Sequence, residues 1–264
     1  MSRYQYLLVT REDGIGTVTI NRPDKLNAFY GSMRQDIAAA VRELAHDDSV
    51  RVLVVTGAGR AFCAGADIGY MKDLLERGDT ANFTTLVEAG RAVVTVIRET
   101  PKPVIASVNG AAAGGGANLA LACDLRIASD RASIGQTFSR IGLHPDWGAT
   151  FFLPRLVGPS RAFELCASGD MVSAEDALRL GLFNRVVPHE QLAAETRALA
   201  VGLAAKPPIA LALAKKALYA SESHSLSEML DLELEHQLRC FASRDAREGF
   251  AAFLEKRTPS FQGK

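Results

Sequence analysis

The stretch NGAAAGGGANLALACDLRIA, residues Asn109–Ala128, holds the features that determine the fold class. It follows a segment of β-branched residues, passes through the consecutive glycines Gly114–Gly116, and continues as a run of alanine and leucine typical of a buried helix. A further apolar segment, Leu125–Ala128, comes directly afterwards. A strand, a glycine turn, a helix and another strand in immediate succession predict an α/β architecture.

The same alternation extends along the chain in both directions. The segments with strand character are Gly16–Ile20, Val50–Thr56, Val104–Val108, Leu125–Ala128 and Arg185–Val187. Amphipathic stretches of helical period, such as Ser32–Ala45 and Asn82–Thr100, lie between several of them. From about Glu190 only helical patterns follow, namely Leu192–Ala204, Pro208–Ser221, Ser225–Phe241 and Asp245–Lys256. We therefore expect an α/β core over residues 1–190 and a C-terminal helical region over residues 191–264.

The composition is that of an ordinary folded chain. The 264 residues include 30 basic and 30 acidic side chains, so the formal net charge is zero, which argues against general nucleic-acid binding. The uncharged stretch Pro103–Cys123 is long enough to suggest a membrane span, but its asparagines, glycines and prolines favour a buried strand, turn and helix. We expect neither a nucleic acid nor a membrane as a partner.

The cysteines and histidines indicate no disulfide framework and no metal site. The four cysteines lie far apart without a CxxC pair, and the five histidines have no metal-ligand spacing. The N-terminal sequence MSRYQYLLVTRED lacks the apolar segment of a secretory signal. These observations predict a cytoplasmic protein with free thiols.

Two strand–glycine–helix junctions are candidates for anion or oxyanion binding, Thr56–Ile68 (TGAGRAFCAGADI) and Val108–Leu121 (VNGAAAGGGANLAL). Such a junction presents unpaired backbone N–H groups at the positive end of a helix. A tight turn or close helix packing explains either junction taken alone equally well. Together they could direct two N–H donors at one oxygen, as in an oxyanion hole.

Four motifs, in this order and spacing, resemble the crotonase (enoyl-CoA hydratase/isomerase) superfamily. They are NRPDKLNAF (Asn21–Phe29), GAGRAFCAGADI (Gly57–Ile68), NGAAAGGGANLALACDLRIA (Asn109–Ala128) and REGFAAFLEKRTPSF (Arg247–Phe261). The resemblance covers nearly the whole chain. It implies a spiral of ββα units with a helical C-terminal region, homotrimers or dimers of trimers, and an acyl-CoA thioester as substrate. It implies no permanently bound cofactor, because coenzyme A arrives as part of the substrate.

The resemblance also assigns expected roles to individual residues. The oxyanion donors fall on the backbone N–H groups of Ala66 and Gly115. The substrate and coenzyme A contacts fall on Lys25, Leu26, Ala28, Ala64, Asp67 and Ile68. Lys256 matches a lysine that reaches coenzyme A on a neighbouring subunit. Both lysines could instead be ordinary solvated side chains.

The two catalytic glutamates of a hydratase of this family are missing. Their positions are occupied by Asn118 and Phe138, which we expect to border the substrate, and neither side chain transfers a proton at neutral pH. Efficient hydration is therefore disfavoured. Asn118 could orient the acyl group or a water molecule, or it could be a structural residue of its helix.

A carboxylate, Asp146, lies eight residues after Phe138, within a Pro-Asp-Trp-Gly turn. Its aromatic surroundings predict a raised pKa, although an aspartate here could also cap the following helix. The stretch Phe138–Gly158 resembles the 1,2-epoxyphenylacetyl-CoA isomerase subgroup, which likewise lacks both glutamates. The resemblance thus predicts an isomerase in which Asp146 moves a proton on the acyl chain.

Other functions are less favoured by the same residues. A hydratase is the first alternative, and a non-catalytic acyl-CoA-binding relative is the second. The family's dehalogenases use a histidine whose position falls near Thr95 here, and His144 is the only histidine expected near the pocket. We expect the region Met71–Thr85 and the C-terminal helices to shape the acyl pocket.

Overall fold

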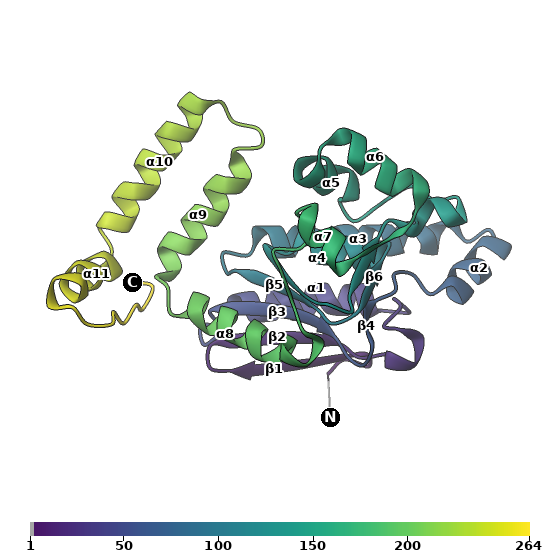
Figure 1. Cartoon of the computed structure of the whole chain (residues 1–264), viewed down its shortest axis with the longest axis horizontal. Helices are drawn as coiled ribbons and strands as arrows, with labels where there is room; N and C mark the ends of the chain where they lie inside the picture. The colour runs from purple at the N-terminus through teal and green to yellow at the C-terminus, as the bar shows by residue number, and fades with distance from the viewer. Residues whose placement is uncertain (1–2) are drawn as a thin grey trace.

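A computed structural model describes residues 3–264, and it contains two β-sheets surrounded by helices (Figure 1). The larger sheet has the order β1-β2-β3-β5-β7-β10. Its strands are β1 (Leu7–Glu12), β2 (Ile15–Ile20), β3 (Val52–Gly57), β5 (Val104–Val108), β7 (Leu125–Ser129) and β10 (Arg185–Val187). The smaller sheet has the order β4-β6-β8-β9, with strands β4 (Ala61–Cys63), β6 (Ala111–Ala113), β8 (Ser133–Gly135) and β9 (Met171–Ser173).

The chain alternates between the two sheets and so forms the expected spiral. β3, β5 and β7 enter the larger sheet in parallel, and each is followed at once by a strand of the smaller sheet, β4, β6 or β8. β3 and β5 are buried almost completely, which explains their β-branched composition. Only β1 reverses direction within the larger sheet. It joins β2 through Asp13 and Gly14, both at positive φ, as a tight hairpin requires.

Helices cover both faces of the larger sheet. The helices of the core are α1 (Met33–His46), α2 (Ile68–Glu76), α3 (Thr80–Glu99), α4 (Gly115–Ala122), α5 (Ala149–Val157), α6 (Pro159–Ser168), α7 (Ala174–Arg179) and α8 (Leu192–Ala204). α1 and α3 pack together over the main core, whereas α8 buries Leu192 and Ala200 in a second apolar cluster with strand residues of the larger sheet. The helix-only part of the sequence, which starts at about Glu190, therefore begins with a helix, α8, that still packs against the larger sheet.

After α8 the chain forms an arm that extends away from the sheets (Figure 1). The arm consists of α9 (Pro208–Ala220), α10 (Leu226–Phe241) and α11 (Arg244–Glu255). Lys215 anchors it, because its Nζ donates to Asp124 Oδ2 at 2.8 Å and to two backbone carbonyls of the core. α10 exposes a row of leucines at helical spacing, Leu226, Leu230, Leu234 and Leu238.

The structure confirms the five strands and the long helices that the sequence predicts. The uncharged stretch Pro103–Cys123 forms β5, β6 and α4, as expected. Among the described residues, no individual helix has the length and apolar character of a membrane span. The bent pair His189–Ala204 and Pro208–Ala220 reaches that threshold only when both halves are counted together.

The fold predicts that Gly116 tolerates no side chain. A Cβ at Gly116 would lie 2.1 Å from the carbonyl oxygen of Cys63, whereas one at Gly202, also helical, would meet open space. We expect Gly116→Ala to lower the free energy of unfolding by about 2 kcal/mol or more. The matched variant Gly202→Ala should raise it by about 0.5–1 kcal/mol. Urea denaturation measures both, and equal effects would contradict this account of the packing.

Candidate active site

The first junction leaves the N–H of Ala66 free to face a ligand. Phe29 N–H donates to the oxygen of Gly65 at 2.7 Å, and Asp67 N–H donates to the oxygen of Phe29 at 3.1 Å. These two bonds flank Ala66 in a parallel bridge. Ala66 itself therefore directs its N–H to the opposite side.

The second junction supplies another free N–H at the start of α4. Gly115 is the first residue of this helix, and N–H groups of a first turn have no partner within the helix. In residues 3–264 no hydrogen bond uses the N–H of Ala66 or Gly115. The junctions adjoin closely, since a Cβ on Gly65 would lie 3.6 Å from Gly115 N. The predicted oxyanion pair therefore has backbone geometry suited to its role.

Both junctions border a cavity of about 350 Å³, which we call the inner cavity. Its polar edge consists of Ala64, Ala66, Gly115, Arg34 and Asp146. Its walls are apolar and consist mainly of Phe29, Ile68, Met71, Phe83, Leu86, Val87, Phe138, Ile141, Leu143 and Trp147. A site with mostly apolar walls and a few converging polar groups is typical of a small-molecule pocket.

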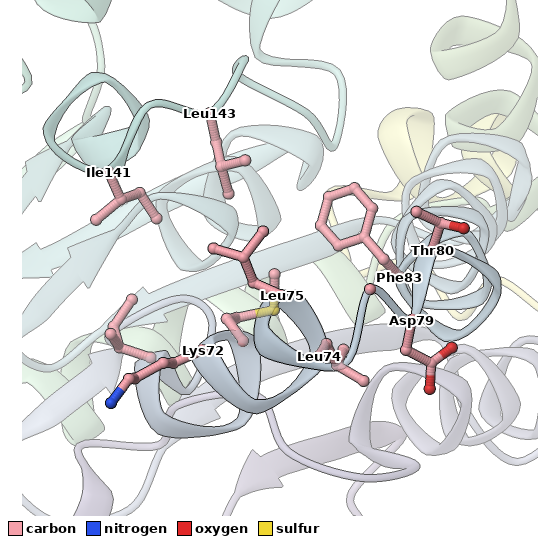
Figure 2. A pocket seen from close by; sticks show the side chains of 11 residues that line it. Lys72, Leu74, Leu75, Asp79, Thr80, Phe83, Ile141 and Leu143 are labelled. Carbon is pink, nitrogen blue, oxygen red and sulfur yellow. The ribbon is translucent and has the colours of Figure 1, made fainter.

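A second cavity, also about 350 Å³, adjoins the first between α2 and the segment Ile141–Leu143. Figure 2 shows Leu75, Phe83 and Leu143 facing one another across this space, while the amino group of Lys72 points away from it. Ile68, Met71 and Phe83 line both cavities. The region Met71–Thr85 thus contributes to the pocket, as predicted, and the space continues beyond the polar edge as an apolar channel.

Asp146 is the only carboxylate among the described residues that line the inner cavity. Burial raises its pKa from the ordinary 3.8 to about 6, although the charge of Arg34 acts in the opposite direction. Its Oδ1 is buried and has no partner. α5 begins at Ala149 without a side-chain cap, so the helix-capping interpretation of Asp146 is wrong.

Two hydrogen bonds support the backbone at Asp146 from residues that do not line the cavity. Asn118 Nδ2 donates to the carbonyl oxygen of Asp146 at 2.9 Å, and Gln136 Nε2 donates to Asn118 Oδ1 at 2.7 Å. Trp147 takes a positive φ of 51° and stacks on Phe29 at 4.7 Å between centroids. Asn118 is fully buried and is not among the residues that line the cavity. The structure therefore favours its structural role over direct contact with an acyl group.

The predicted coenzyme A residues of the first motif lie beside the site. Ala64 N–H donates to the oxygen of Leu26 at 3.0 Å, which aligns residues 26–29 with the Ala66 junction. Ala28 belongs to that segment, and Lys25 is exposed at its start. Lys25, Leu26 and Ala28 themselves line neither cavity, and Ala28 is buried, so their contact with coenzyme A stays a prediction.

Two predicted contacts are placed elsewhere. Asp67 accepts a hydrogen bond from Tyr70 N–H as the cap of α2 and forms an ion pair with Arg22 at 2.7 Å, and it does not line either cavity. Lys256 ends α11 on the arm, far from the pocket within one chain (Figure 1). It could act only in the pocket of another subunit, as the resemblance implies.

Arg34 also lines the inner cavity, although no sequence motif predicted it as a site residue. The sequence did contain a signal, because Arg34 occupies the same helical face as Ile37, Val41 and Leu44, where an apolar residue is expected.

Within residues 3–264 no cluster of three histidine, cysteine, aspartate or glutamate side chains could hold a metal ion. Cys63 and Cys123 are buried free thiols, and Cys166 and Cys240 are free and half-buried.

The chain is similar over nearly its whole length to known proteins of one family. The family model of enoyl-CoA hydratase/isomerase matches residues 10–264. A 1,2-epoxyphenylacetyl-CoA isomerase of Escherichia coli (strain K12) is 41% identical over 98% of this chain and 99% of its own. A crotonyl-CoA hydratase of Syntrophomonas wolfei is 37% identical over 99% of both chains. The crystal structure of an enoyl-CoA hydratase from Bacillus anthracis has a TM-score of 0.92 and 34% identity, covering 98% of this chain and 100% of that one.

The raised pKa of Asp146 predicts a pH-dependent cost to stability. The folded-state pKa of about 6 exceeds the ordinary 3.8. Ionisation of Asp146 therefore favours the unfolded chain increasingly as the pH rises from 3.8 through 6. We expect Asp146→Asn to unfold with a free energy about 1–2 kcal/mol higher than the wild type at neutral pH and above. The difference should decline as the pH falls through 6 and vanish near the ordinary pKa of 3.8.

Urea denaturation across this pH range tests the prediction, with the exposed Asp48→Asn as a control. A constant difference between Asp146→Asn and the wild type would contradict the raised pKa.

Proposed function

The chain belongs to the enoyl-CoA hydratase/isomerase family, and from this premise we propose that it is an isomerase. Its substrate is a coenzyme A thioester, and its reaction shifts a proton and a double bond along the acyl chain. The observation that carries the proposal is the pairing of two free backbone N–H groups with a single half-buried carboxylate in one apolar cavity.

In the proposed reaction the thioester oxygen accepts hydrogen bonds from Ala66 N–H and Gly115 N–H. The carboxylate of Asp146 removes a proton from the acyl chain, and the electron pair moves toward the thioester oxygen to form a dienolate. The protonated Asp146 then returns the proton to another carbon, which moves the double bond. A pKa of about 6 suits a group that must both accept and donate a proton near neutral pH.

Hydration is the less favoured alternative, although relatives of this chain carry hydratase names. Adding water requires one group to activate the water molecule and a proton delivered to the α-carbon. Phe138 lines the cavity without a titratable group, and Asn118 is engaged in holding Asp146. A non-catalytic binder is disfavoured because burying one oxygen of the Asp146 carboxylate without a partner is costly and serves no purpose in a passive pocket.

We further propose that coenzyme A enters only as part of the substrate and that the protein works as a homotrimer or a dimer of trimers. The exposed leucine row of α10 is an apolar surface suited to burial against other copies. In such an assembly Lys256 of one subunit reaches the coenzyme A bound to its neighbour.

The isomerase proposal predicts proton exchange that depends on Asp146. We expect 3-hexenoyl-CoA incubated with the protein in heavy water to be converted to the 2-enoyl isomer and to gain deuterium without adding water. In Asp146→Asn the rate should fall about 10²–10⁴-fold, because the amide cannot accept the proton. Mass spectrometry follows both products, and Asp48→Asn should retain the wild-type rate.

Either of two results would contradict the proposal. Full turnover by Asp146→Asn would exclude this carboxylate as the base. Addition of a complete water molecule by the wild type would indicate a hydratase that operates without the two expected glutamates.

The assembly proposal predicts that charge on the leucine row dissociates the oligomer. We expect the double variant Leu230→Glu/Leu234→Glu to sediment as a smaller species than the wild type, because burying two carboxylates in an apolar interface is strongly unfavourable. Glu233→Gln on the same helix is the control. Sedimentation velocity measures the masses, and an unchanged mass of the double variant would place the interface elsewhere.

A further inference from the structure

The guanidinium of Arg34 is buried in the free protein without the partners that a buried charge needs. Arg34 is 5% exposed, on the first turn of α1, and its Nη1 is buried with no hydrogen-bond partner. Within residues 3–264 no hydrogen bond or ion pair involves its side chain. A buried, unpaired cation is strongly unfavourable, so its presence calls for a compensating function.

The surroundings of Arg34 fix its position but leave its donors unused. Its guanidinium lies 5.1 Å from the centroid of the Phe29 ring, and Phe29 in turn stacks on Trp147. A cation–π contact supplies no oxygen acceptor to the N–H donors of the guanidinium. The aromatic neighbour therefore leaves these donors without a hydrogen-bond partner.

The neighbouring ionisable groups do not neutralise Arg34 directly. Its charge interacts with Asp146, Cys63 and Tyr70, and burial raises the pKa of the Cys63 thiol to about 12, so this thiol stays neutral. Asp146 is the remaining acidic neighbour within reach, but it forms no ion pair with Arg34, and its own Oδ1 also lacks a partner. Both groups line the inner cavity, so a ligand there can meet both.

We infer that Arg34 binds an oxygen atom of the acyl group, so that the preferred substrates are acyl-CoA thioesters whose chain carries a hydroxyl, ether or keto oxygen. This rests on the proposed function in placing an acyl chain in the inner cavity. A plain alkyl chain would leave the guanidinium desolvated and unpaired, whereas an oxygen acceptor would satisfy it. Sites built to hydrogen-bond a substrate oxygen discriminate strongly against analogues that lack it. Arg34 is then a specificity-determining residue, distinct from the base Asp146.

Binding measurements with non-isomerisable ligands test this inference. We would compare hexanoyl-CoA with its 3-, 4- and 5-hydroxy derivatives by isothermal titration calorimetry. The wild type should bind at least one hydroxylated ligand about ten- to a hundredfold more tightly than hexanoyl-CoA. Arg34→Met should lose this preference while binding hexanoyl-CoA at least as well, and Arg34→Lys should retain part of it. Arg42→Met, on the exposed face of the same helix, should behave as the wild type.

Thermal unfolding of the free variants separates ligand binding from a structural role. Since Arg34 has no hydrogen bond to lose, we expect the Tm of Arg34→Met to equal or exceed that of the wild type. A marked fall in Tm would overturn the inference. An equal affinity of the wild type for all four ligands would do so too, as would a preference that survives in Arg34→Met.

These outcomes are separable from failure of the proposed function. Tight binding of hexanoyl-CoA with no selectivity due to Arg34 would remove this inference and leave the isomerase proposal intact. Selectivity that depends on Arg34, without proton exchange on 3-hexenoyl-CoA or its hydroxylated analogues, would support this inference and remove the isomerase proposal.

Discussion

Direct contact between two backbone turns is the constraint on which the rest of the structure depends. A Cβ at Gly57, Gly110 or Gly116 would lie 2.1–2.3 Å from a backbone carbonyl oxygen, and one at Gly65 would lie 2.7 Å from another. The contact at Gly57 lies within the turn between β3 and β4, whereas the others show that residues 60–65 around β4 and residues 110–116 around β6 touch main chain to main chain. This contact joins the two sheets and sets the Ala66 and Gly115 N–H groups beside the same cavity. The fold and the site thus share one set of glycines.

The site concentrates the unfavourable features of an otherwise conventional core. Asp146 and Arg34 each bury a polar atom without a partner, and Trp147 takes a left-handed conformation rare for an aromatic residue. Around them the walls are apolar, and the hydrogen bonds of Asn118 and Gln136 hold the strained turn from outside the cavity. Such local costs are typical of sites maintained for function rather than stability.

The sequence predicted the long elements because their patterns are strong, and it missed those without a pattern. The buried strands and the amphipathic helices were found where their periodicity spans a full element. β4, β6, β8 and β9 have three residues each, and their existence depends on pairing with distant segments. β10 is equally short, but its adjacent valines Val186 and Val187 indicated a strand. In the site, Ala66, Gly115 and Asp146, which the motifs single out, line the same cavity. Motif spacing could not distinguish the lining residue Phe138 from the supporting residue Asn118, because the direction of a side chain depends on tertiary packing. Arg34 was overlooked although its place on an apolar helix face is visible in the sequence.

The two free N–H groups belong to the main chain, and this has an evolutionary consequence. A point mutation at Ala66 or Gly115 changes the side chain, but only proline removes the donor itself. The apolar cavity between α2 and the segment Ile141–Leu143, by contrast, is lined by ordinary side chains. Mutations can therefore change the walls, while most substitutions at Ala66 and Gly115 leave the donors in place. Divergence of substrate preference without loss of the underlying chemistry is then the expected course for such a scaffold.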